Sequence, residues 1–260
     1  MSEHLVLSER RGPIGLVTLH RPDKKNAMSR ALVLQLSDTL SHLSADPTAR
    51  VLVLTGAGGT FCAGMDLREA SDAAQSDEAE QKAIAEVCGL ADLVHQLHTF
   101  PKITIAAVNG DALAGGAGLA MACDFVVMAQ RARLGYPEVL RGLVPAIVMQ
   151  DLVRLVGERR ARHLLLTGLP IDSATALHWG LANKVVHEDD CHDEAMALAE
   201  RCLAGGPMAV AAIKRLIDEA TKRLPDLRGP AAITAAVRVS EEAIEGMRAF
   251  LERRPPRWTK

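Results

Sequence analysis

Aromatic residues are scarce in this sequence, and long apolar runs are missing. Phe, Trp and Tyr together make up 3% of the 260 residues, and the formal net charge is −2. Base stacking needs aromatic side chains and phosphate binding needs excess positive charge, so we expect no nucleic-acid partner. No apolar run reaches the roughly 20 residues of a membrane span, and the N-terminus lacks a signal-peptide pattern. We therefore expect no membrane association and a cytoplasmic location.

Cysteines are few and show no pairing pattern. The five cysteines, an odd number without any Cys-X-X-Cys pair, are Cys62, Cys88, Cys123, Cys191 and Cys202. Scattered thiols of this kind are typical of a reduced protein. Histidine, aspartate and cysteine gather at 187–193, but their mixed spacing fits a solvated loop that opens a helix. We expect no metal site there.

Three common catalytic or nucleotide-binding motifs are also missing. The glycine-rich run 56–61 has Phe61 where a dinucleotide-binding fingerprint needs its last glycine. No Gly-Lys-Ser/Thr sequence is present for a P-loop, and no Gly-X-Ser-X-Gly elbow is present for a serine hydrolase. Dinucleotide binding, P-loop chemistry and serine hydrolysis are therefore not expected.

A strand, a glycine-rich loop and a helix follow one another between residues 102 and 124. The short apolar run 103–108 predicts a strand buried on both faces. Four glycines lie between 110 and 118, and residues 119–122 favour a buried helix. Free amides at a helix start attract negative charge, and glycine lets a ligand oxygen approach the backbone, so this stretch predicts an anion-binding turn. The alternative is that these glycines only allow a helix to pack closely on a strand.

Strands alternate with helices as far as residue 187, and only helices are expected beyond it. Buried strands are expected at 14–19, 50–56, 103–108 and 125–128, with helices after Ser29, at 78–98, at 145–156 and at 158–166. In the 78–98 helix, the predicted buried positions are Ile84, Val87, Ala91, Val94 and Leu97. This order predicts an α/β core over 1–195 and a C-terminal helical region over 196–260.

Seven motifs extend over nearly the whole chain. They are RPDKKNAMS at 21–29, VLTGAGGTFCAGMDL at 53–67, IAAVNGDALAGGAGLAMACD at 105–124, LGYPEVLRGLVP at 134–145, LLLTG at 164–168, WGLANKVV at 179–186 and GMRAFLERRPP at 246–256. Together they resemble the crotonase family, the enoyl-CoA hydratase/isomerase superfamily. The resemblance implies a ClpP-like spiral of ββα units and a C-terminal helical region that forms a homo-trimer, commonly paired into a hexamer. It also implies an acyl-CoA substrate and no separate cofactor, because coenzyme A is part of the substrate.

Enzymes of this family stabilise an enolate, or a related oxyanion, of a coenzyme A thioester. By resemblance, the backbone amides of Met65 and Gly115 hold the charged oxygen. Such donors, fixed before the reaction, are each worth roughly 2.7 to 4 kcal/mol of barrier in well-studied enzymes. The resemblance also makes Glu138 the acid/base. Burial beside an acyl chain would raise its pKa toward neutrality, which suits proton transfer at carbon.

Other residues take roles that are implied only by position in the family motifs. Glu138 could instead be a capping or surface residue, and the lone tyrosine, Tyr136, could be packing or could hydrogen-bond in the pocket. The residues implied to line the substrate and coenzyme A are Lys24, Asn26, Ala27, Ala63, Asp66, Leu67, Gly116, Tyr136 and Phe250. Phe250 and the basic tail of a neighbouring subunit are implied to close the site. Lys24, Lys25, Arg253 and Arg254 could meet the phosphates.

The sequence departs from the hydratase pattern at one position. Typical hydratases of the family carry a second glutamate where this chain has Gly118. A single base is enough to move a double bond, whereas hydration must also activate a water, so Glu138 alone fits both Δ3-Δ2-enoyl-CoA isomerisation and a one-carboxylate hydratase. We place hydration slightly ahead. A third possibility is a non-catalytic crotonase-fold binding protein.

Overall fold

Two β-sheets organise the chain. The computed structural model describes residues 4–73, 78–221 and 228–259. The six-stranded main sheet has the order β1-β2-β3-β5-β7-β10, with bounds Val6–Arg11, Ile14–Leu19, Val51–Gly56, Ile103–Val108, Phe125–Ala129 and Lys184–Val186. The smaller sheet has the order β4-β6-β8-β9, with bounds Thr60–Cys62, Asp111–Leu113, Arg133–Gly135 and Ile171–Asp172. Neighbouring strands are parallel except for β1 with β2 and β8 with β9.

Successive units repeat one pattern of a main-sheet strand, a small-sheet strand and a helix. β3 and β4 lead to α2, β5 and β6 lead to α4, and β7 and β8 lead through the 3-10 helix η2 to α5. This repetition confirms the expected spiral of ββα units. The helices of the core are α1 Arg30–Ala45, α2 Leu67–Ala73, α3 Ala79–His98, α4 Gly115–Ala122, α5 Met149–Thr167 and α6 Ser173–His178, with η1 at Pro22–Lys24 and η2 at Pro137–Arg141.

The predicted helices form largely where expected, but one buried position in α3 differs from the prediction. Ser29 caps α1, accepting a hydrogen bond from the Leu32 amide at 3.2 Å. Along α3, Val87, Ala91, Val94 and Leu97 are buried as predicted, but Ile84 is 42% exposed and Ala83 takes the buried position. The two helices expected on either side of Gly157 form one element, α5, which is broken at Gly157 with φ +74°.

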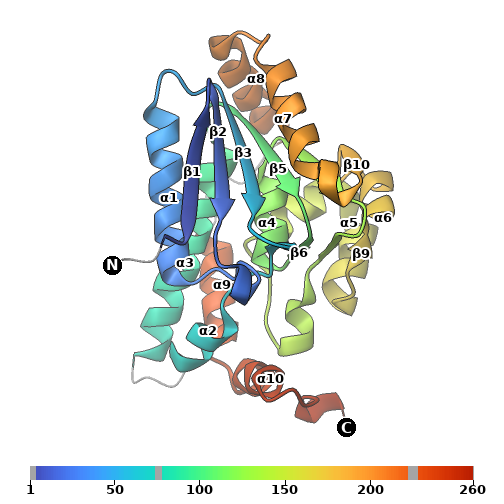
Figure 1. Cartoon of the computed structure of the whole chain (residues 1–260). Coiled ribbons are helices and arrows are strands. Elements are labelled where there is room, and N and C mark those ends of the chain that lie inside the picture. Colours follow the sequence, from blue (N-terminus) through green and yellow to red (C-terminus); the bar gives the residue numbers. More distant parts are fainter. Residues whose placement is uncertain (1–3, 74–77, 222–227, 260) are drawn as a thin grey trace.

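The C-terminal helices pack on different parts of the core. They are α7 Cys191–Cys202, α8 Pro207–Ala220, α9 Arg228–Arg238 and α10 Glu241–Leu251, with η3 Glu188–Asp190 before them and η4 Arg257–Thr259 after them. α7 runs past residue 195 and packs on β3, β5 and β7, whereas α10 packs on α2 and η2 at the other end of the molecule (Figure 1). The boundary at 195 stays a prediction.

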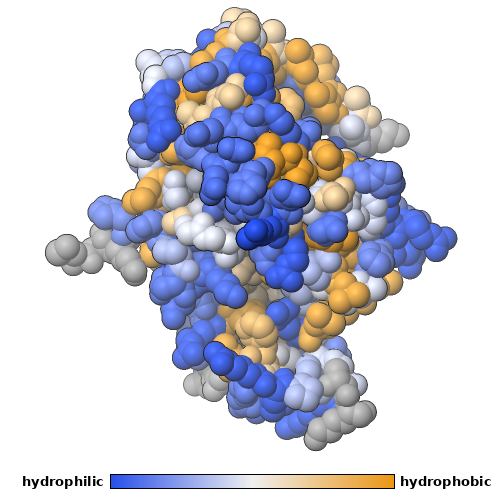
Figure 2. Space-filling model, turned by 45° about the vertical axis from the view of Figure 1, so that its right-hand side comes forward, coloured by the Kyte–Doolittle hydropathy of each residue, from blue (hydrophilic) through white to orange (hydrophobic). Residues whose placement is uncertain are grey.

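α8 contributes no buried residue and carries apolar side chains on its outer face. Met208, Ile213, Leu216 and Ile217 are 86%, 54%, 61% and 52% exposed. Figure 2 shows apolar surface at the top of the molecule, the end where Figure 1 places α8. Among the described residues, no single helix is long and apolar enough to span a membrane; α7 with its preceding turn and α8 meet that test only as a pair bent by 106°.

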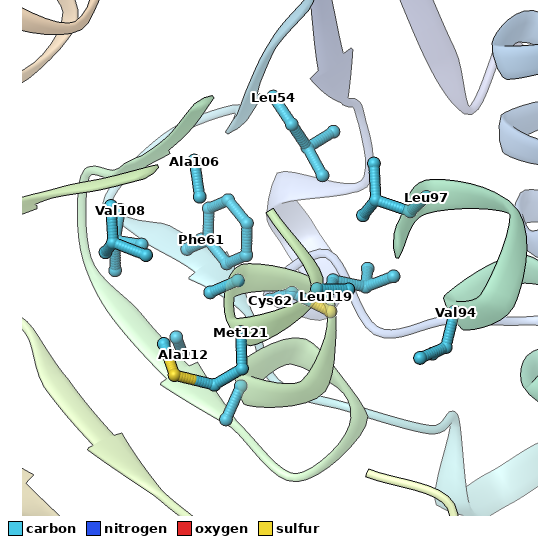
Figure 3. Packing of buried hydrophobic residues seen from close by; sticks show 14 of the residues in the cluster. Leu54, Phe61, Cys62, Val94, Leu97, Ala106, Val108, Ala112, Leu119 and Met121 are labelled. Atoms are coloured by element: carbon cyan, nitrogen blue, oxygen red, sulfur yellow. The ribbon is translucent and has the colours of Figure 1, made fainter. Parts of the chain in front are cut away.

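The main hydrophobic core lies between the sheet and the helices α1, α3 and α4. Leu54 and Ala106 of the main sheet, Phe61 of β4, Leu97 of α3 and Leu119 of α4 are all fully buried and point into this core (Figure 3). Since α4 is buried on every side, its first turn is held rigidly. That turn carries the glycine-rich loop predicted to bind an anion.

Candidate active site

Two loops from different ββα units meet at the start of α4. Gly64 has φ +92°, a conformation that favours glycine, and a side chain there would lie 2.6 Å from the Ala114 Cβ and 3.3 Å from the Gly115 amide nitrogen. A side chain on Gly116 would overlap the carbonyl of Cys62. The 62–66 loop therefore lies in direct contact with the first turn of α4, which brings Met65 and Gly115 into one neighbourhood.

The backbone of Met65 is oriented by its pairing with Met28. The Met28 amide donates to the Gly64 carbonyl at 2.7 Å, and the Asp66 amide donates to the Met28 carbonyl at 3.0 Å. In parallel pairing, the two residues that flank Met65 make both of these bonds, so the Met65 amide points away from Met28. Within the described part of the chain, that amide donates to no protein acceptor and is available to a ligand.

The Gly115 amide is presented by a strained turn. Ala114 has φ +54° and ψ −128°, a region that alanine rarely adopts and that costs of order 1–3 kcal/mol. Its own amide donates to the Gly135 carbonyl at 2.8 Å, which fixes the turn against β8. Gly115 is the first residue of α4, and no side chain caps this helix start. Its amide thus carries the partial positive charge of an uncapped helix.

Glu138 lies in η2, the 3-10 helix that begins two residues after β8. β6 and β8 pair in parallel with Leu113 beside Gly135, and the Ala114 amide donates to the Gly135 carbonyl at 2.8 Å, so η2 follows the strand that lies next to the glycine loop. The carboxylate Oε2 of Glu138 is buried and has no hydrogen-bond partner among the described residues. Burial raises the pKa of Glu138 to about 7, opposed by its own backbone amide and by Arg141. A carboxyl poised near neutrality can both take and return a proton.

Arg141, the last residue of η2, contacts Phe250 of α10. The Arg141 guanidinium carbon lies 4.4 Å from the centre of the Phe250 ring, and Nη1 donates to the Pro137 carbonyl at 2.9 Å. Burial lowers the pKa of Arg141, although the charge of Glu138 acts in the opposite direction. The backbone of Arg141 packs against Gly246 of α10 so closely that no side chain fits at that glycine. Phe250 therefore reaches the surroundings of the site within its own chain.

Tyr136 is fully buried, two residues before Glu138. Its hydroxyl has no hydrogen-bond partner in the part of the chain that the structure describes. Burial first, and then the charges of Glu138 and Asp151, raise the pKa of Tyr136 well above its usual value, so the hydroxyl stays protonated and able to donate. Sequence reasoning had left packing and hydrogen bonding in the pocket as alternatives for this tyrosine. The structure adds that one loop carries two buried oxygens, Tyr136 Oη and Glu138 Oε2, without protein partners.

The structure leaves no room for a side chain at position 118, where the resemblance implies a second carboxylate in typical hydratases. A Cβ built on Gly118 would overlap the side chain of Val148, which precedes the first residue of α5. Asp151, one turn further along α5, is buried, and burial raises its pKa to about 6. Asp151 was not singled out from the sequence, because its burial arises from the packing of α5 against other elements. Oδ1 of Asp151 lies 3.8 Å from Nη2 of Arg154.

Two of the residues implied to contact coenzyme A, Asn26 and Asp66, have side chains that bond to other protein groups. Asn26 is completely buried, accepting from the Arg21 amide at 2.9 Å and donating to the carbonyls of Ala57 and Thr60 at 2.9 and 2.7 Å. The Asp66 carboxylate pairs with Arg21 at 3.1 Å. These side chains hold loops together, so contact with a ligand would come from their neighbouring backbone.

The other implied residues lie on or close to the same loops. Lys24 ends η1, with Lys25 and Ala27 close behind it, and the Ala63 amide donates to the Lys25 carbonyl at 3.0 Å. Leu67 begins α2 and packs with Met65 in a small apolar cluster beside α10. Lys24 and Lys25 are exposed. Over 4–73, 78–221 and 228–259, no three His, Cys, Asp or Glu residues are placed to hold a metal ion.

Comparison with known proteins identifies the class of this fold and site. The family model for enoyl-CoA hydratase/isomerase matches residues 9–260. A Thermus thermophilus protein, provisionally named an enoyl-CoA hydratase, is 41% identical over 254 residues, covering 95% of this chain and 98% of its own. A carnitinyl-CoA dehydratase from Citrobacter koseri is 36% identical, with 99% of each chain covered.

Solved structures agree with the sequence relatives. The carnitinyl-CoA hydratase of Mycobacterium avium superimposes with a TM-score of 0.84 at 36% identity, covering 99% of both chains. An enoyl-CoA hydratase from Bacillus anthracis gives a TM-score of 0.78 at 32% identity, covering 97% of this chain and 98% of its own. The chain therefore belongs to the enoyl-CoA hydratase/isomerase family. It is an enzyme with the crotonase fold, and its relatives are named as hydratases and dehydratases, which are lyases.

Proposed function

We propose that the protein is an enoyl-CoA hydratase-type lyase that adds water to the double bond of a 2-enoyl-CoA, or removes it in the reverse direction. The observation that carries this proposal is Glu138: its Oε2 is buried with no partner among the described residues, its pKa is about 7, and it lies in η2, directly after the strand next to the glycine loop. The relatives named hydratase and dehydratase support the same reaction in its two directions.

Hydration uses the two backbone amides and the carboxylate together. Ionised Glu138 takes a proton from a water while the water oxygen forms a bond to C3 of the enoyl group. The electron pair of the double bond moves onto the thioester, whose oxygen becomes negative. The amides of Met65 and Gly115 donate hydrogen bonds to that oxygen and so stabilise the enolate. Because both donors are held by rigid backbone, they need no reorganisation during the reaction.

The same carboxyl completes the reaction. Protonated Glu138 returns its proton to C2, the enolate collapses to the thioester, and Glu138 is ionised again. All three atoms of one water are then in the product: the hydroxyl group is on C3 and the second hydrogen is on C2. A pKa near 7 suits both halves, since neither the proton uptake nor the proton return is strongly uphill.

Double-bond isomerisation is the second candidate. Glu138 would remove a proton from C2 of a 3-enoyl-CoA and return it to C4, through the same stabilised enolate. The specific observation in favour is the packing of Val148 against Gly118, which leaves no side chain at the position of the second carboxylate. Position 138 has the glutamate that the family motif implies as acid/base, and its carboxyl oxygen is buried. This argues against the third possibility, a non-catalytic binding protein.

The experiment compares two substrates with the same purified protein. Crotonyl-CoA should lose its enoyl absorbance as water is added, and mass spectrometry should show the gain of one water. A 3-hexenoyl-CoA should be converted more slowly. If the 3-enoyl substrate becomes the 2-enoyl form while crotonyl-CoA is unchanged, the enzyme is an isomerase and the hydratase proposal is wrong.

The substrate is bound as a coenzyme A thioester without a separate cofactor in this proposal. The loops that carry Lys24, Asn26, Ala27, Ala63, Asp66, Leu67 and Gly116 would contact it, largely through backbone groups. The apolar outer face of α8 supports assembly into a homo-trimer or hexamer, because exposed apolar patches of this kind mark protein interfaces. We keep a cytoplasmic location as part of the proposal.

A further inference from the structure

A buried arginine that the proposed reaction does not use lies between α9 and α3. Arg238, the last residue of α9, is 1% exposed, and its Nη2 donates to the Glu86 carboxylate of α3. Its Nε and Nη1 are also buried, and neither has a hydrogen-bond partner within residues 4–73, 78–221 and 228–259. Buried polar groups in folded proteins are almost always paired, so two free donors on one guanidinium need a physical explanation.

Both helices tie this ion pair to the active site. Glu86 lies one turn before Leu90 on α3, and the Leu90 side chain is 3.6 Å from the position of a Cβ on Gly115. On α9, Thr234 lies one turn before Arg238, and its hydroxyl is 3.4 Å from the Val144 carbonyl in the segment that follows η2. Each member of the ion pair is therefore on the same helix as a residue that borders the glycine loop or the segment after η2, and one turn, about 5.4 Å along the axis, away from it.

Small apolar residues share the packed faces of α3 and α9 that carry the ion pair. Ala231 and Ala235 are buried on the same face of α9, and Ala83 and Val87 are buried on the adjacent part of α3. An acyl chain that extends from the thioester toward α3 and α9 would therefore meet short apolar side chains and then the guanidinium. A chain made only of CH2 groups would leave both free N–H groups unpaired and shielded from water, which is unfavourable.

The charge of the site selects the kind of acceptor. Glu86 already balances the positive charge of Arg238, and its side chain is 20% exposed. A neutral oxygen would satisfy the two donors without adding charge, whereas a carboxylate would leave an uncompensated negative charge beside apolar residues. A hydroxyl or carbonyl oxygen fits both requirements.

We propose that Arg238 forms a second polar subsite, which binds a hydroxyl or carbonyl oxygen in the distal part of the acyl group. The enzyme then prefers acyl-CoA thioesters that carry such an oxygen a few carbons beyond the reacting double bond over plain hydrocarbon chains of the same length. This inference rests on the proposed function for the identity of the bound thioester, and it names the class of acyl group.

Binding measurements test the subsite without turnover. Isothermal titration gives the Kd of two saturated ligands, hexanoyl-CoA and 6-hydroxyhexanoyl-CoA, for the intact protein. A site built to hydrogen-bond a substrate oxygen discriminates strongly against an analogue without it, so we expect the hydroxy ligand to bind at least about tenfold more tightly. In Arg238→Met, the two Kd values should become equal. Arg248→Met, a change at an exposed arginine of α10, is the matched control and should keep the preference.

A second variant protects the test against loss of folding. Arg238→Met leaves Glu86 without its partner, so the double variant E86Q/R238M replaces the ion pair by two uncharged side chains and should also lose the preference. Equal binding of the two ligands by the natural protein, or a preference kept by both variants, overturns the subsite. So does tighter binding of adipoyl-CoA, whose distal group is a carboxylate, or binding of none of these ligands. Failure to hydrate crotonyl-CoA would remove the proposed reaction but would leave this binding result standing.

Discussion

The side chain of Val148 fills the space that a side chain on Gly118 would need. By the resemblance described above, position 118 corresponds to the second glutamate of typical hydratases, so this valine gives a steric reason for the single carboxylate of the proposed reaction. The contact joins α4, which starts at the Gly115 amide, to the start of α5. The chemistry of the site and the packing of these two helices are therefore coupled.

Gly118→Glu should disrupt the fold rather than supply a second acid/base. Overpacking a buried contact costs typically 1–3 kcal/mol, and a buried carboxylate adds to that cost. We expect a lower midpoint of thermal unfolding and no gain in crotonyl-CoA hydration. Gly118→Glu combined with Val148→Gly should regain part of the lost stability. As a control, Gly229→Glu introduces the same side chain at a position where a Cβ would meet no atom of the other described residues within 4 Å, and it should leave stability nearly unchanged. A stable, unimpaired Gly118→Glu protein would contradict the steric account.

Removing the Glu138 carboxylate should strongly reduce turnover and retain binding. General acid–base catalysis contributes typically 10²–10⁴-fold, so Glu138→Gln should lower kcat by about a hundredfold or more while the Kd of a saturated acyl-CoA changes little. In the natural enzyme, kcat/KM should fall as pH decreases through about 7, because protonated Glu138 cannot accept the proton of water. Glu241→Gln, at an exposed glutamate, is the control. A pH profile that is flat between 5 and 8 would exclude Glu138 as the base.

The same carboxyl should make stability depend on pH. The folded-state pKa of Glu138, about 7, lies above its ordinary value of 4.5, so folding favours the protonated form. Its stabilising contribution is complete below pH 4.5 and is lost as pH rises through 7. At pH 8 we expect Glu138→Gln to unfold at a higher denaturant concentration than the natural protein, by up to about 3 kcal/mol in free energy of unfolding. At pH 4.5 the two proteins should differ little. If Glu138→Gln and the natural protein were equally stable at both pH values, the carboxylate would not be buried in solution.

Much of this site could be predicted from the sequence because its parts are local. The turn before α4, the 62–66 loop and η2 each lie within one short motif, and the Ser29 cap is visible in the sequence as well. The buried face of α3 was predicted one residue out at Ile84, because helical spacing alone does not decide which of two adjacent apolar residues meets the neighbouring helix.

The features that sequence reasoning missed depend on segments far apart in the chain. Val148 reaches Gly118 across 30 positions, and Arg238 meets Glu86 across 152. Asn26 was expected to contact coenzyme A, but its side chain holds the backbone of residues 57 and 60. Such contacts are fixed by tertiary packing, which no local pattern encodes. Only the residue type of Asn26 could have hinted at a structural role, since asparagine readily pairs with backbone groups in turns.

Tyr136→Phe should separate packing from catalysis. The hydroxyl of Tyr136 is buried without a partner, so its removal should leave the midpoint of thermal unfolding unchanged or slightly higher. If that hydroxyl and the free oxygen of Glu138 hold the reacting water between them, kcat for crotonyl-CoA should fall by about tenfold with little change in KM. Tyr136→Leu, which also removes the ring, should lower stability as well. An unchanged kcat in Tyr136→Phe would assign this tyrosine to packing alone.

The outer face of α8 should be covered by another copy of the chain in solution. The helix is held to the core by its polar residues: Lys214 pairs with Asp124 at 2.6 Å, and Asp218 with His98 at 2.9 Å. Its apolar residues are left outside, with Leu216 61% exposed. Leu216→Asp should therefore convert a trimer or hexamer into smaller species in sedimentation or light-scattering measurements, because a charge buried in an apolar interface is strongly unfavourable. Glu219→Lys, an exposed polar change on the same helix, should keep the assembly. A natural protein that sediments as a monomer at micromolar concentration would show that this face has another purpose.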